Sequence, residues 1–177
     1  MHAVADIYDE LSRDVPFLRI HGDCHQGNLL KGDDGFFFLD FDDFLCGPAV
    51  QDLWMLLPVT DREGLRQREL LLEGYRLFRD FDPSWLRLIE PLRALRYIHY
   101  AGWIACRWED PAFPKIFPHF GTHEYWENET SDLEKQLTLI KNFEESSAHL
   151  MTHDEPDRKD TDDNELTNKD FFWNLDE

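Results

Sequence analysis

Two apolar runs that flank a short polar turn are the feature that most limits how this chain can fold. The second run, FFFLDF at residues 36–41, follows the turn residues KGDDG at 31–35, and the apolar pair LL at 29–30 precedes that turn. Apolar runs joined by glycine and aspartate are typical of a β-hairpin, because these residues accept the backbone angles of tight turns. We therefore expect a hairpin of residues 29–30 and 36–41. The apolar stretch FLRI at 17–20 is expected to form a further strand that runs into the hairpin region.

Apolar residues recur at helical spacing through most of the remaining chain up to residue 150. An acidic residue followed by proline, as in Asp82–Pro83, is a typical helix start, and Pro58 marks a helix end. The helix that starts at Asp82 can bend at Pro91. The expected fold class is therefore α+β and mainly helical. The predicted helices cover residues 1–14, 49–57, 62–80, 82–109 and 122–148, with a proline-punctuated loop at 111–121.

The composition changes from Met151 onward. Residues 154–177 hold ten acidic residues against three basic ones, a net charge of −7. Segments with high net charge and few apolar groups to bury stay disordered. We expect a domain over 1–150 and an acidic, disordered tail over 151–177. The apolar end of this tail, FFWNL at 171–175, is a candidate to dock on a partner or on the domain.

The net charge of −19 over 177 residues limits the partners of the chain. Nucleic acid and anionic membranes both require a basic face, so neither is an expected partner. ATP is still compatible, because a few local cations or a metal ion can reverse the field inside one cleft. The chain has three cysteines and no CxxC pair, which favours a reduced protein. Its N-terminus is acidic and does not resemble a signal peptide, and no apolar run is long enough to span a membrane. We therefore expect a cytoplasmic protein.

The segment HGDCHQGN at residues 21–28 carries the candidate chemistry. Phosphoryl transfer needs a carboxylate that accepts the proton of the acceptor hydroxyl, and oxygen ligands for magnesium. Asp23 and Asn28, five residues apart on a turn that leaves a strand, can supply a base and an amide ligand. Asp40 ends the paired strand of the hairpin, which would bring its carboxylate to the same side.

The pattern HGDxxxxN, followed by an apolar strand that ends in aspartate, resembles the catalytic loop and metal-binding aspartate of the aminoglycoside phosphotransferase and choline kinase superfamily. These enzymes are relatives of the protein kinases, whose corresponding motifs are HRDxxxxN and DFG. GPAVQDLWMLL at 47–57 and the stretch 93–118 are similar to the C-terminal lobe of a bacterial serine/threonine protein kinase of this superfamily. The resemblance covers residues 15–145. It implies the C-terminal lobe of a protein-kinase-like fold, with ATP as co-substrate and Mg²⁺ as cofactor.

The same resemblance implies roles for five residues. Asp23 would be the catalytic base, and Asn28 and Asp40 would be magnesium ligands that bind the cofactor and orient the nucleotide. His21 would brace the metal-binding strand, and Asp52 would hydrogen-bond the catalytic loop. Only eleven residues separate Asp40 from Asp52, too few for a long phosphorylatable loop, so an activation-loop switch is not expected.

Other residues nearby have open roles. One of Asp42 and Asp43 could lie near a second metal ion, and the other could anchor the turn. The sequence does not assign these two roles to one residue or the other. Cys24 and His25 are assigned no part in the chemistry.

Alternative interpretations of the loop also stay open. A polar turn of this composition is often only a turn. His21, Cys24 and His25 can suggest zinc. Their HxxCH spacing lacks a second pair of ligands, however, and Asp23 suits magnesium better. The phosphate acceptor could be protein serine or threonine, or a small hydroxyl compound of the aminoglycoside, choline or homoserine type.

The N-terminal lobe of a kinase of this type is expected to be absent. Only 20 residues precede His21, and they contain no lysine and no glycine-rich loop. The chain would then be either a truncated kinase or a non-catalytic binding module derived from a kinase C-terminal lobe. The presence of Asp23, Asn28 and Asp40 favours the truncated kinase, which on its own is expected to be inactive or weak.

Overall fold

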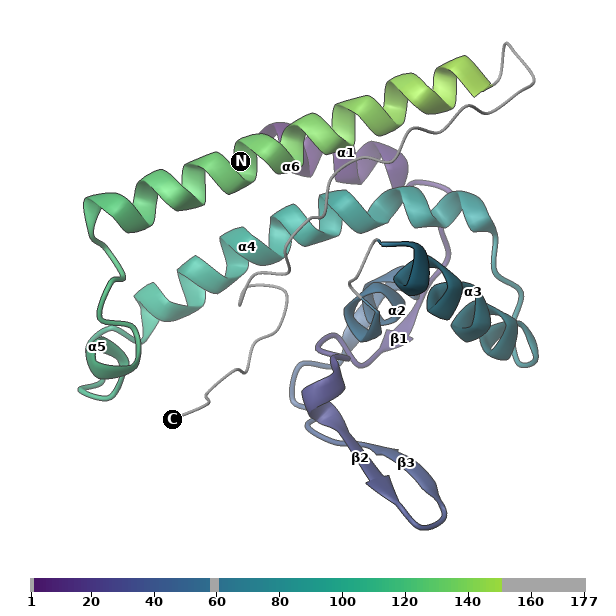
Figure 1. Cartoon of the computed structure of the whole chain (residues 1–177), viewed down its shortest axis with the longest axis horizontal. Coiled ribbons are helices and arrows are strands. Elements are labelled where there is room, and N and C mark those ends of the chain that lie inside the picture. Colours follow the sequence, from purple (N-terminus) through teal and green to yellow (C-terminus); the bar gives the residue numbers. More distant parts are fainter. Residues whose placement is uncertain (1, 58–60, 151–177) are drawn as a thin grey trace. The chain divides into compact units, whose positions relative to one another are not determined.

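A computed structural model describes residues 2–57 and 61–150 of the chain (Figure 1). They form two compact units, which consist of residues 2–10 with 90–150 and of residues 11–57 with 61–89. The tail predicted at 151–177 lies outside the described residues. None of the helices within the described ranges combines the length and the apolar character needed to cross a membrane.

The first unit is made of helices. Val4, Ala94 and Ile140, from three different helices, are buried in one cluster, so the apolar faces of these helices meet. Figure 1 shows the short N-terminal helix and α4 beside the long α6. The helices of this unit are α1 (His2–Leu11), α4 (Ile89–Cys106), α5 (Phe113–Ile116) and α6 (His123–Leu150).

The helices predicted for this part of the chain are confirmed, with differences at their ends, except that the single helix predicted at 82–109 is divided into a 3-10 helix over Pro83–Leu88 and α4. α4 stops at Cys106, short of the predicted end at 109. Pro91 lies in the first turn of α4, where a backbone N–H has no intrahelical partner, so proline removes no helical hydrogen bond there. The loop predicted at 111–121 contains the one-turn helix α5.

The second unit contains the four strands found in the described part of the chain. They form two antiparallel pairs, and the predicted hairpin is confirmed as one of them, with Leu29 opposite Phe38 and Gly32 opposite Gly35. Its second strand ends at Phe38 rather than at the predicted residue 41. The pairs are β1 (Phe17–Ile20) with β4 (Leu45–Pro48), and β2 (Leu29–Gly32) with β3 (Gly35–Phe38).

β4 is absent from the sequence-based prediction, which assigned no strand after residue 41 and began a helix at residue 49. Pro48 is the last residue of this strand and pairs with Phe17, the first residue of β1. Proline is tolerated at the end of an edge strand because its missing N–H costs no central ladder bond. The segment that leaves the hairpin therefore returns to β1 and brings residues 39–44 back beside the loop that follows β1.

Helices cover the rest of the second unit. Trp54, Leu72 and Leu88 are almost completely buried and supply its core. The predicted start at Asp82 is confirmed in a modified form, because its carboxylate accepts a hydrogen bond from the Ser84 backbone N–H (2.8 Å) and caps a 3-10 helix. The helices are α2 (Val50–Leu56), α3 (Arg62–Arg76) and the 3-10 helices η1 (Gln26–Asn28) and η2 (Pro83–Leu88). The described chain is thus mainly helical with small antiparallel sheets, as expected.

Candidate active site

The polar loop at residues 21–28 leaves the end of β1 through a turn that requires glycine. Gly22 has φ = +88°, a left-handed conformation that side chains disfavour. A Cβ added there would lie 2.3 Å from the backbone oxygen of Asp43. The loop therefore approaches the returning segment more closely than any residue with a side chain would allow.

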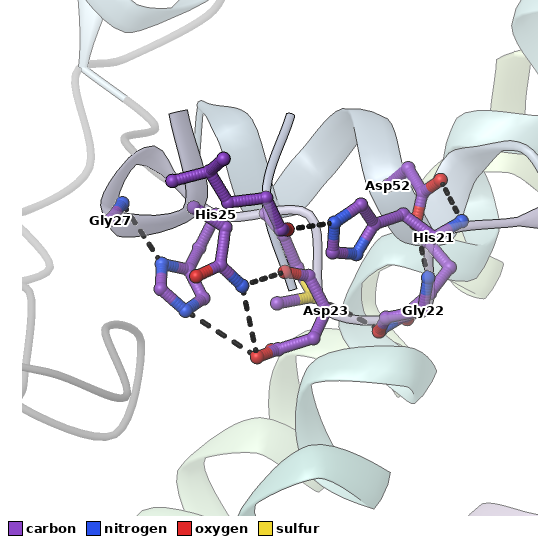
Figure 2. Close-up of polar contacts among 10 residues, drawn as sticks. His21, Gly22, Asp23, His25, Gly27 and Asp52 are labelled. Carbon is purple, nitrogen blue, oxygen red and sulfur yellow. Dashed lines mark hydrogen bonds and ion pairs between the residues drawn. The ribbon is translucent and has the colours of Figure 1, made fainter. Parts of the chain in front are cut away.

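Asp52, in the first turn of α2, holds the start of this loop (Figure 2). Its Oδ2 accepts a hydrogen bond from the His21 backbone N–H at 2.8 Å, and its Oδ1 accepts one from the Gly22 N–H at 3.0 Å. Burial raises the pKa of the Asp52 carboxyl, and the two backbone donors oppose that shift. A carboxylate that accepts two adjacent backbone N–H groups fixes the direction in which the loop leaves β1.

Asp23 and Asn28 are brought together by the loop. The Asn28 Nδ2 donates to the Asp23 backbone oxygen at 3.0 Å and lies 3.5 Å from its carboxylate Oδ2. The His25 backbone N–H also donates to the Asp23 oxygen, at 3.0 Å. The loop thus closes on itself and presents a carboxylate and an amide next to each other.

Asp40 follows Leu39, which makes hydrogen bonds to the loop through both its backbone N–H and its backbone oxygen. The Leu39 N–H donates to the Asn28 backbone oxygen at 2.9 Å, and the His21 Nε2 lies 2.7 Å from the Leu39 oxygen. Asp40 itself has φ = +59°, the one positive value among the described residues other than glycine. Such a backbone conformation is uncommon and clusters at functional sites, although aspartate tolerates it better than most residues.

Asn28 and Asp40 have the chemistry to hold a magnesium ion. Magnesium is bound by oxygen ligands, mainly carboxylates and carbonyls. Because Asn28 uses its Nδ2 to hold Asp23, Oδ1 is the atom that it can offer to a cation. The residues present therefore fit the expected Mg²⁺ by their chemistry. Asn28 supplies an amide oxygen on the loop, and Asp40 supplies a carboxylate directly after Leu39, which hydrogen-bonds to the loop.

His25 makes contacts that the sequence-based prediction did not include. Its side chain is buried, with 2% exposure. Its Nδ1 accepts a hydrogen bond from the Gly27 N–H at 3.0 Å, and its Nε2 lies 3.4 Å from Oδ2 of Asp23. The available signal was its position directly before η1, where a side chain that can accept a hydrogen bond serves as a helix cap.

Cys24, Asp42 and Asp43 are placed without a defined role in the site. Cys24 is buried, and burial together with the charges of Asp52 and Asp23 raises the pKa of its thiol to about 12. The side chains of Asp42 and Asp43 are exposed to solvent.

The hairpin beside the loop exposes large apolar side chains. Phe36 is 66% exposed and Phe37 is 51% exposed. Phe41, in the segment that returns from the hairpin, is 53% exposed, and its ring centroid lies 4.6 Å from that of His21. Large apolar side chains that are exposed close together in the chain can mark a place where a ligand or another protein surface binds.

Comparison with known proteins defines the class of protein to which this site belongs. Residues 2–89 match the phosphotransferase enzyme family, and they include the loop, the hairpin and Asp52. This chain therefore belongs to that family.

The relatives are bacterial kinases. Stress response kinase A of Escherichia coli (strain K12) is 44% identical over 138 residues, which are 78% of this chain and 42% of the relative. A protein of Salmonella typhimurium (strain LT2) named serine/threonine protein kinase RdoA is 46% identical over 127 residues, which are 72% of this chain and 38% of that protein. The resemblance to a bacterial serine/threonine kinase is thus confirmed, and stress response kinase A is a relative to which this chain is similar. The chain spans about two fifths of the length of the curated relatives that it matches.

Proposed function

We propose that this chain carries the catalytic loop of an ATP- and magnesium-dependent phosphotransferase that phosphorylates protein serine or threonine in the cytoplasm. The observation that carries the proposal is that one loop closes on itself and places Asp23 next to Asn28. Leu39, which hydrogen-bonds to this loop, directly precedes Asp40. The acceptor class is supported by the name of the relative called a serine/threonine protein kinase.

Each of the three side chains has a separate task in this proposal. The Asp23 carboxylate orients the acceptor hydroxyl and takes up its proton as the oxygen attacks the terminal phosphate of ATP. Asn28 and Asp40 would hold magnesium, which when bound neutralises charge on the phosphates. His21 and Asp52 do not react. They fix the strand before Asp40 and the start of the loop through the hydrogen bonds to Leu39 and Gly22.

The exposed hairpin supports the view that this chain is one part of a larger catalytic domain. Its phenylalanines, which lie on β3, are open to solvent, and the relatives are more than twice as long as the region matched here. We propose that the adenine base and a further lobe of the kinase cover this surface. The 177-residue chain alone should then turn over weakly or not at all, and robust ATP-dependent phosphorylation by it would contradict this part of the proposal.

Substitution of Asp23 tests the proposed function. The measurement needs a longer protein, here called the extended polypeptide, in which this chain is joined to the part of stress response kinase A that the match does not cover. Asp23→Ala should lower its turnover by a factor of about 10²–10⁴, the usual contribution of a general base.

Asp33→Ala is the matched control, because Asp33 is an exposed acid in the hairpin turn. It should leave turnover unchanged. Unchanged turnover in Asp23→Ala would refute the assignment of the base. Transfer to choline or an aminoglycoside, but not to protein, would refute the acceptor class and leave Asp23 in place.

A further inference from the structure

His25 is held in one orientation by the loop itself. Its ring caps η1, where its Nδ1 accepts the hydrogen bond from the Gly27 N–H at 3.0 Å. A Cβ added to Gly27 would lie 2.7 Å from Cε1 of this ring, so a residue without a side chain is needed for the backbone to come this close. The ring is 98% buried and cannot turn toward solvent without breaking the cap.

The cap also decides where the ring carries its proton. A neutral imidazole has one donor nitrogen and one acceptor nitrogen. Because Nδ1 accepts from Gly27, the proton of the neutral ring is on Nε2. Nε2 makes no hydrogen bond within the described part of the structure, and it lies 3.4 Å from Oδ2 of Asp23 (Figure 2).

The same carboxylate oxygen is approached from a second side. The Asn28 Nδ2 lies 3.5 Å from Oδ2 of Asp23. Two donor nitrogens near one oxygen favour a single rotamer of Asp23, because the buried and unsatisfied Nε2–H can gain a hydrogen bond only if that oxygen stays on its side. Both contacts are longer than a good hydrogen bond. An approach of about 0.5 Å would bring them to the usual hydrogen-bond distance. Catalytic hydrogen bonds are often long before substrate binds.

We propose that His25 is a positioning residue for phosphoryl transfer, whose Nε2–H holds the Asp23 carboxylate in the rotamer that accepts the proton of the attacking hydroxyl. The inference rests on the proposed function of the loop. It assigns a role to a residue that the sequence pattern left without one. It also separates two tasks of one ring, since Nδ1 stabilises the loop and Nε2 orients the base.

Two substitutions separate these tasks. Asparagine caps helices as well as any residue, and its Oδ1 can replace Nδ1, but it has no group at the position of Nε2. His25→Asn should therefore keep the melting temperature and the KM for ATP of the extended polypeptide close to their original values. It should lower kcat about 10- to 100-fold, the usual cost of a misplaced catalytic group.

Glutamine is the matched opposite. Its Nε2 can reach Asp23, whereas its amide is not placed to accept from Gly27. His25→Gln should lower the melting temperature and still recover most of the kcat that His25→Asn loses. Full kcat in His25→Asn, or equal losses of kcat in both variants that follow their melting temperatures, would overturn the positioning role.

A spectroscopic readout keeps this inference separate from the proposed function. In the 177-residue chain, ¹⁵N NMR of the neutral form of the His25 ring should place its proton on Nε2. The ¹³C signal of the Asp23 carboxyl should shift in His25→Asn and stay in place in His25→Gln. An unshifted signal in His25→Asn would overturn the His25–Asp23 contact whether or not the protein turns over. A shifted signal together with an extended polypeptide that transfers no phosphate would instead count against the proposed function.

Discussion

The loop at 21–28 and the hairpin at 29–38 are adjacent in sequence and opposite in character. The loop is packed and internally bonded, with His25 2% exposed and Asn28 8% exposed. The hairpin carries Phe36 at 66% exposure. The loop takes its support from within its own unit, whereas the apolar face of the hairpin lacks a cover among the described residues. Under the proposed function, this chain would hold the chemical groups of the site, and another part of the kinase would supply the surface that encloses the nucleotide.

The largest loss of stability is expected where the loop depends on glycine. Gly22→Ala places a Cβ against the backbone of Asp43, at a position with φ = +88°. Backbone atoms cannot move aside as a flexible side chain does, so we expect a loss of about 3 kcal/mol or more in the free energy of unfolding, measured by urea denaturation.

Gly35→Ala is the control for this prediction, because it shares a positive φ of +136° but has nothing within 4 Å of the added Cβ. Its cost should be confined to backbone strain, about 1–2 kcal/mol. Equal losses in the two variants would mean that the loop does not depend on its close approach to the returning segment.

A smaller loss is expected from Asp52→Asn. The amide keeps one oxygen for the backbone donors of His21 and Gly22 and turns an NH₂ group toward the other donor. One poorly satisfied backbone group costs about 1–3 kcal/mol, which thermal denaturation can measure.

Asp61→Asn is the matched control, because Asp61 caps α3 through a single hydrogen bond from the Gly64 N–H (2.7 Å). Asparagine and aspartate are equivalent caps, so this change should be close to neutral. If Asp61→Asn cost as much as Asp52→Asn, the paired hydrogen bonds at the start of the loop would have no special weight.

The smallest effect on stability is expected in the hairpin. Phe36→Ser removes an exposed ring and should change the free energy of unfolding of the 177-residue chain by no more than about 0.5 kcal/mol. It should also reduce the binding of a hydrophobic dye. Leu72→Ala, at a fully buried position, should by comparison cost about 2–5 kcal/mol. A loss above about 1.5 kcal/mol in Phe36→Ser would show that the hairpin face is already covered in this chain.

The hairpin and the helix starts could be predicted because their signals are local. The turn KGDDG and the pair Asp82–Pro83 act through neighbouring backbone groups. β4 could not be predicted, since its pairing with β1 depends on a return of the chain over more than 20 residues. A glycine and a proline near its end also resemble a boundary. Propensity is a weaker signal than such tertiary pairing.

The candidate site shows the same division. Asp23, Asn28 and Asp40 could be selected because their residue types and spacing suit phosphoryl transfer. The positive φ of Asp40 and the burial of His25 could not, because both depend on how the returning segment and the loop pack. His25 is a polar residue in a polar loop, and its sequence position alone does not show that its ring turns inward toward Asp23.

The most direct test of the central claim is the magnesium dependence of turnover in the extended polypeptide. Asparagine tolerates the left-handed backbone of residue 40, so Asp40→Asn should fold and still lose a charged magnesium ligand. It should raise the Mg²⁺ concentration for half-maximal turnover by at least about tenfold. Asp23→Asn should lower kcat by a factor of about 10²–10⁴ and leave that concentration unchanged. A magnesium dependence in Asp40→Asn identical to that of the unmodified protein would contradict the account of this loop and its partner strand as a phosphotransfer site.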